Sequence, residues 1–164
     1  MLKDTTSRLR DPHDLAWAAG FFDGEGCVRI NVYHHRDSKL PLMNLRVTVN
    51  NTDRRAIDKL HDLFPGSIQY IRPGSVKHRM QIRWDRHGNT RAYEFCKAIL
   101  PFSVIKRDQL ELAIAFVELP WRIHSRTSSR KHCRTDDEVV IDESYAKQLS
   151  ALKKVSNISS GVGI

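Results

Sequence analysis

The sequence has no apolar run long enough to cross a membrane and no apolar leader at its start. A membrane-spanning helix needs about 18 or more consecutive apolar residues, and no segment of the 164 residues approaches that length. The first residues, MLKDTTSRLRDPHD, mix both charges and lack the apolar stretch of a secretory signal. These absences predict a protein with no membrane partner that is not secreted.

Cysteine is also scarce. The three cysteines, Cys27, Cys96 and Cys133, are an odd number and contain no C-x-x-C spacing, which argues against a disulfide framework and against a cysteine zinc site. His124 and His132 lie near Cys133, but no fourth ligand follows at a useful spacing, so zinc is not predicted. We therefore expect an intracellular protein in a reducing compartment.

Acidic residues are too few to balance the basic ones. Twenty-seven Lys and Arg face 19 Asp and Glu, which gives a net charge of +8 and a pI near 9.7. The excess is concentrated in residues 66–107, with nine basic residues against Asp85 and Glu94. No basic amphipathic helix stands out, so a nucleic acid is favoured over a membrane surface or a small-molecule substrate as the partner.

The apolar periodicity predicts one α+β domain with the element order αββαββα and further C-terminal helices. Helices are expected over 12–24, 52–64, 90–100, 103–119 and 136–154, and strands over 27–35, 45–50, 67–72 and 77–85. Asp11 is the expected N-cap of the first helix, with Pro12 at its first position. The core would span 1–120, followed by a basic connector at 121–135 and a helix with a frayed tail at 136–164.

Each predicted strand alternates apolar and polar residues, so one face of an antiparallel sheet would pack on the helices. The other face would be rich in Arg, Asn and Gln, which hydrogen-bond base edges and phosphates. An ordinary solvated face is the alternative. The predicted DNA-contacting residues are Arg29, Asn31, Tyr33, Asn44, Arg46, Thr48, Gln69, Arg72, Lys77, Arg79, Gln81 and Arg83.

The first helix carries a strip of small residues. Ala16, Gly20 and Gly24 recur at every fourth position, and small side chains at a helix contact allow close packing. Alanine alone would mean little, because it is a good helix former. Each glycine, however, costs about 1 kcal/mol relative to alanine within a helix, which favours a packing role.

The stretch AAGFFDGEG, residues 18–26, resembles the motif that names the LAGLIDADG homing endonucleases. The positions that match outright, by Asp/Glu exchange or by a large apolar side chain are Ala19, Gly20, Phe21 or Phe22, Asp23, Glu25 and Gly26. The resemblance covers roughly residues 11–120. It implies a site-specific endonuclease that cuts both strands of a long pseudo-palindromic DNA site and leaves short 3′ overhangs.

The resemblance also implies a Mg²⁺ cofactor held by Glu25 and by the backbone carbonyl of Gly24. Carboxylate oxygen suits this hard cation, and an acid facing an anionic backbone would be repulsive without a metal. Asp23 is implied to cap the helix and to support the subunit interface.

Three further catalytic residues are implied by the resemblance. Asn51, with Asn50 as the alternative, would orient water, and Arg55, with Arg54 as the alternative, would supply positive charge. Lys106 would stabilise charge at the scissile phosphate. Asn51 could instead be a helix N-cap, and Lys106 could be a solvated residue at the start of a helix.

A second copy of the motif is absent from the sequence. Members with one motif pair as homodimers, so a homodimer is implied. The resemblance also suggests an intron-encoded protein in a DNA-containing compartment, either an organelle or bacterial or phage cytoplasm. The predicted interface residues are Ala16, Ala19, Gly20, Asp23 and Gly24. The alternative function is a non-cleaving nucleic-acid-binding protein of the same fold, either an intron maturase or a regulator.

Overall fold

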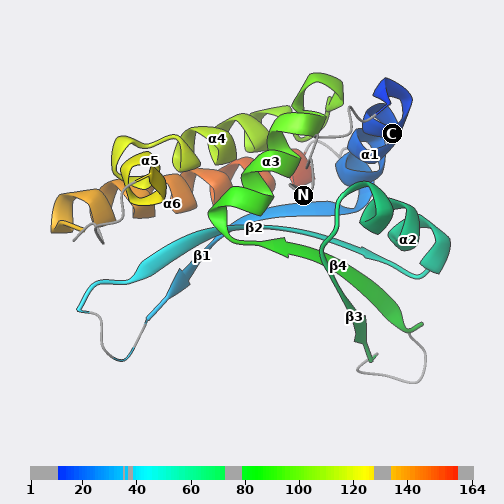
Figure 1. Ribbon diagram of the computed structural model, residues 1–164, viewed down its shortest axis with the longest axis horizontal. Coiled ribbons are helices and arrows are strands. Elements are labelled where there is room, and N and C mark those ends of the chain that lie inside the picture. Colours follow the sequence, from blue (N-terminus) through cyan, green and yellow to red (C-terminus); the bar gives the residue numbers. More distant parts are fainter. Residues whose placement is uncertain (1–10, 35, 37–38, 73–78, 128–133, 159–164) are drawn as a thin grey trace, which may run out of the picture.

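The computed structural model describes residues 11–34, 36, 39–72, 79–127 and 134–158. Its elements follow the predicted order αββαββα, with further helices after it (Figure 1). They are α1 (Pro12–Glu25), β1 (Gly26–Tyr33), β2 (Leu42–Asn51), α2 (Arg54–Leu63), β3 (Ser67–Ile71), β4 (Gln81–His87), α3 (Asn89–Ile99), the 3-10 turn η1 (Leu100–Phe102), α4 (Arg107–Val117), α5 (Pro120–Thr127) and α6 (Asp136–Ile158). The α+β fold class is confirmed.

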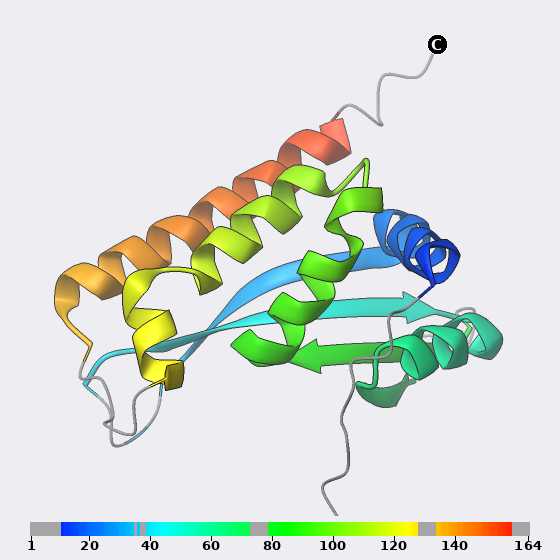
Figure 2. The same ribbon diagram turned by 45° about the horizontal axis from the view of Figure 1, so that its top comes forward.

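The four strands form one antiparallel sheet in the order β1-β2-β4-β3. The sheet arches, and the described helices lie on its convex side (Figure 1). Figure 2 shows α6 alongside α4, at the β1 side of the sheet. No helix of the described ranges covers the concave face, and none of them is long and apolar enough to span a membrane.

An aromatic cluster fastens the helices to the sheet. The ring of Phe95 on α3 lies 5.1 Å from Phe22 of α1, 4.9 Å from Phe64 and 5.1 Å from Trp84 of β4. All four side chains are fully buried, and the indole Nε1 of Trp84 donates to the carbonyl of Phe64 at 3.0 Å. Burying each aromatic side chain contributes on the order of 2 kcal/mol, so this cluster fixes α1 on the sheet.

Local contacts fix both ends of α1. The Asp11 carboxylate accepts from the His13 backbone N–H at 2.8 Å, as the cap prediction requires. At the other end the chain turns directly into β1 at Gly26, where a Cβ would lie 2.3 Å from the ring of Phe22. Glycine is therefore required, and Glu25 is held at the start of the sheet.

Four predicted boundaries are corrected. β4 begins at Gln81 rather than residue 77, so Arg79 precedes the strand, while Lys77 lies outside the described residues. The helix expected from 103 begins at Arg107, because residues 103–106 form a turn bound to Asp23. The predicted connector begins as helix α5, and the last helix extends to Ile158.

The C-terminal helices are fixed by a buried ionic cluster. Asp142 of α6 is fully buried and accepts from Arg122 at 2.5 Å and from Arg134. Arg122 also donates to the carbonyl of Met43 at 3.1 Å, and Arg134 donates to that of Pro41 at 2.6 Å. We call these three charged residues the C-terminal clamp; they join α5 and α6 to the start of β2.

Candidate nucleic-acid interface and catalytic end

The concave face brings together most of the predicted DNA-contacting residues. Directly paired residues in an antiparallel sheet point to the same side, and the register pairs Arg29 with Arg46 and Asn31 with Asn44. Arg83 lies across from Gln69, and its Nε donates to Asn50 Oδ1 at 3.0 Å. The predicted residues on these four strands are Arg29, Asn31, Tyr33, Asn44, Arg46, Thr48, Gln69, Gln81 and Arg83.

The face carries one acid that the sequence analysis did not place there. Asp85 pairs with Thr48 in the register, is almost fully buried and binds Arg46 through both carboxylate oxygens. This hydrogen bonding raises the pKa of Arg46. Thr48 is itself buried, so its side chain offers little surface for a DNA contact. Arg72, which follows β3, and Arg79, which precedes β4, are exposed.

Asp23 organises the turn that leads into α4. Its carboxylate accepts four hydrogen bonds, from Ser103 Oγ at 2.6 Å and from the backbone N–H groups of Val104, Ile105 and Lys106 at 2.7, 3.0 and 3.1 Å. Burial opposes ionisation, but these bonds outweigh it and lower the pKa of Asp23. Both oxygens are thus engaged within their own chain, and no local sequence pattern indicates Ser103 as their partner.

The turn carries Lys106 to the end of α1. Its Nζ donates to the backbone carbonyl of Asp23, and the negative charges of Asp23 and Glu25 raise the pKa of its ammonium group. Burial nevertheless lowers the pKa of Lys106. Two residues that the motif analysis assigned to the catalytic end, Glu25 and Lys106, therefore lie within electrostatic reach of each other.

Glu25 is the exposed acid of the motif. In the part of the chain that the structure describes, its carboxylate makes no hydrogen bond or ion pair, although the charge of Lys106 acts on it. The carboxylate and the nearby carbonyl of Gly24 are the oxygen ligands that Mg²⁺ prefers. Across the described ranges, no three acidic, histidine or cysteine residues cluster as a metal site.

Asn51 and Arg55 lie at the same end of the sheet as α1's C-terminus, because Gly26 of β1 pairs with Val49 of β2. Asn51 Oδ1 accepts from the Asp53 backbone N–H at 2.8 Å. Asp53, not Asn51, is the N-cap of α2, accepting from the Arg55 backbone N–H at 2.9 Å. The Arg55 guanidinium pairs with Asp53 at 2.6 Å and is 90% exposed.

The predicted alternatives to these two residues have other partners. Asn50 accepts from Arg83, as described above. Arg54 donates to Asp58 at 2.9 Å, four residues along α2, and to the hydroxyl of Tyr70 on β3. Arg54 therefore braces α2 against the sheet edge.

The predicted interface residues of α1 divide into two groups. Ala16, Gly20 and Gly24 are exposed and form the small strip, whereas Ala19 and Asp23 are buried in their own chain. The side chains of Ala19 and Asp23 therefore serve the fold of a single chain. Beside the end of the strip, the Asp23 turn exposes two apolar side chains, Val104 at 81% and Ile105 at 66%.

No family model matches the sequence, and no curated protein matches it. Solved structures do match. The homing endonuclease I-CvuI, in a complex with the I-CreI target, aligns with a TM-score of 0.66 and 19% identity over 87% of this chain and 85% of that one. The homing endonuclease I-TnaI aligns with a TM-score of 0.61 and 15% identity over 87% and 97%.

A third match names the motif. The LAGLIDADG homing endonuclease I-GzeII, in complex with a DNA target, aligns with a TM-score of 0.55 and 12% identity over 84% of this chain and 43% of that one. The alignments extend over 84% to 87% of this chain. This chain has the fold of the LAGLIDADG homing endonucleases.

Proposed function

We propose that this chain is a metal-dependent DNA endonuclease that acts as a homodimer and cuts both strands of a long pseudo-palindromic site, leaving short 3′ overhangs. One observation carries the proposal. Glu25 is an exposed carboxylate at the junction where α1 leads into β1, and its charge acts on Lys106. An exposed acid at that position suits a cation between protein and phosphate.

The concave face suits double-stranded DNA. It is bare of described helices and carries Arg29, Arg83 and Gln81, with Asn31 and Asn44 paired across two strands. Arg, Asn and Gln pair with base edges, and a β-ribbon fits the major groove. The solved structures of similar fold include I-CvuI and I-GzeII bound to DNA.

The chemistry divides among a few side chains. Glu25 and the carbonyl of Gly24 would hold Mg²⁺, which supplies Lewis acidity and an activated water. Lys106 would stabilise the charge that develops on the phosphate. Asn51 would orient the water, and Arg55, which is largely exposed, would contact a phosphate. Asp23 takes no part in metal binding, since it holds the turn that positions Lys106.

The glycines of the small strip support a dimer. A Cβ added at Gly20 or Gly24 would meet no atom within 4 Å in the single chain, so internal packing does not require glycine at either position. Each glycine costs about 1 kcal/mol relative to alanine. Close approach of a second helix would explain both residues, with Val104 and Ile105 extending the contact. A symmetric dimer reads a site of matching symmetry.

Cleavage is tested on a DNA duplex that represents the uninterrupted insertion site. This duplex is made by joining the sequences that flank the reading frame on its two sides. We expect the wild-type protein to cut this duplex with Mg²⁺. Glu25→Gln should bind it with unchanged affinity in EDTA and fail to cut it, while the control Glu143→Gln, on α6, should cut normally. Tight binding by the wild type without cutting would identify the protein as a non-cleaving maturase or regulator.

The dimer is tested by sedimentation. We expect Gly20→Leu to fold as judged by circular dichroism and to sediment as a monomer, because the new side chain projects where a second backbone would approach. Thr90→Leu, a matched change at an exposed position of α3, should remain dimeric. A wild-type monomer that cleaves DNA would overturn the homodimer.

A further inference from the structure

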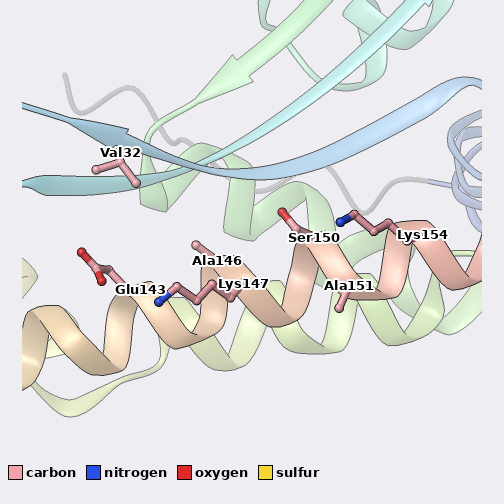
Figure 3. Close-up of a pocket in the computed structure, with 7 residues that line it drawn as sticks. All are labelled: Val32, Glu143, Ala146, Lys147, Ser150, Ala151 and Lys154. Carbon is pink, nitrogen blue, oxygen red and sulfur yellow. The ribbon is translucent and has the colours of Figure 1, made fainter.

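Helix α6 runs along the edge of the sheet toward the catalytic end. β1 is the outermost strand in the described sheet, and α6 packs against both α4 and β1. Figure 3 shows α6 following β1 along a groove lined by Val32 on the strand and by Lys147, Ser150 and Lys154 on the helix. The C-terminal turns of α6 thereby come near the start of β1.

Lys153 makes a contact there that crosses from the helix layer to the concave face. Its Nζ lies 3.6 Å from Cys27 Sγ. Cys27 belongs to the concave face, because it alternates with the fully buried Val28 and receives a hydrogen bond from Arg29 Nε at 3.3 Å. Since no strand lies beyond β1, the lysine side chain reaches around the sheet edge.

The contact is next to the residues assigned to cleavage. Cys27 follows Glu25 by two positions, and the charge of Glu25 acts on Lys106. Three basic side chains, Arg29, Lys106 and Lys153, therefore gather around the first residues of β1.

We propose that Lys153 is a phosphate-contacting residue at the catalytic end, supplied by the C-terminal helix to the DNA backbone beside the scissile group. The inference rests on the proposed function and adds to it a residue outside the αββαββα core. The role requires only that the ammonium group reach the concave face, which the contact with Cys27 provides.

The electrostatics favour an anion at this position. Lys153 is half-buried, and this burial lowers the pKa of its ammonium group. The contact with Cys27 opposes the shift, and the positive charge of Arg29 adds to it. Bringing like charges together and removing them from water both disfavour the charged forms. A phosphate oxygen between Arg29 and Lys153 would relieve this repulsion, and charge-assisted hydrogen bonds to phosphate are among the strong ones in proteins.

The test measures binding of a mixed-sequence 30-bp duplex in EDTA as the salt concentration is varied, with no cleavage required. Each phosphate contact contributes about 0.9 to the slope of log K against log salt. We expect Lys153→Met, which keeps the apolar stem, to lower the slope by about 0.9 per protomer. Lys147→Met, the same change at an exposed position of α6, should leave it unchanged, and Lys153→Arg should restore it.

Thermal unfolding separates a structural role from a phosphate contact. A Lys153→Met protein with a lowered melting temperature and the wild-type salt slope would overturn the inference, as would an equal loss of slope in Lys147→Met. The proposed function is tested separately. If the wild-type protein never cuts DNA but the slope difference is present, the nuclease proposal is wrong and the phosphate contact of Lys153 stands.

Discussion

Two buried aspartates, at opposite ends of the helix layer, are stabilised in different ways. Asp23 receives three backbone N–H groups and the Ser103 hydroxyl. Asp142 receives the guanidinium groups of Arg122 and Arg134. Neutral dipoles satisfy the first carboxylate, and full positive charges satisfy the second.

The difference matches what each aspartate positions. Backbone donors have no rotamers, so the Asp23 turn fixes the main chain at Lys106 within a narrow range. The C-terminal clamp joins long side chains whose guanidinium groups also donate to Met43 and Pro41, and it holds two helices on one strand. Asp23 therefore positions the turn that carries Lys106, and Asp142 joins the C-terminal helices to β2.

The largest effect is expected for Asp142→Asn. The substitution leaves two buried guanidinium groups without a carboxylate, and breaking a buried ion pair on one side costs about 3–5 kcal/mol. Urea unfolding followed by circular dichroism measures the loss, with Glu143→Gln as the neighbouring control. A loss under about 1 kcal/mol would show that the clamp does not hold the scaffold together.

We expect Asp23→Asn to lower the free energy of unfolding less than Asp142→Asn does and to lower the cleavage rate more. An amide retains one acceptor oxygen but places N–H groups against backbone donors, and an unsatisfied buried donor costs about 1–3 kcal/mol. We expect the cleavage rate to fall because the turn that carries Lys106 loosens. Unchanged cleavage by a destabilised protein would separate the Asp23 turn from catalysis.

The pH dependence of stability follows from the same carboxylate. The folded state holds the pKa of Asp23 below its ordinary value of 3.8, so its contribution is complete above that value and is lost as the pH falls through the folded pKa. The unfolding free energy of the wild type should therefore drop more steeply in acid than that of Asp23→Asn. Parallel curves would contradict this assignment.

The smallest effect is expected for Ser103→Ala. This change removes one of four donors and leaves the three backbone N–H groups on Asp23, so we expect a loss of about 1 kcal/mol. Ser144→Ala, which removes an exposed hydroxyl that donates to Ile141, provides the control. A loss as large as that of Asp23→Asn would mean that Ser103, rather than the backbone, satisfies the carboxylate.

Local patterns predicted the elements and the position of Glu25, because strand alternation, the Asp11 cap and the Gly26 turn involve near neighbours. The partners of Asp23 were not predictable in this way, since Ser103 lies 80 positions further along the chain. Charge composition did not reveal the role of Arg122 and Arg134, which lie in the predicted basic connector at 121–135 but are largely buried on Asp142. Likewise, alternation placed Arg46 on the concave face without revealing that Asp85 neutralises it.

The course of α6 along β1 also bears on how the chain avoids self-association during folding. An outermost strand presents unpaired backbone N–H and C=O groups that can template pairing with another chain. α6 packs along this edge, so truncating the chain before Asp136 would uncover it. We therefore expect the same helix that would bring Lys153 to DNA to limit edge-to-edge aggregation.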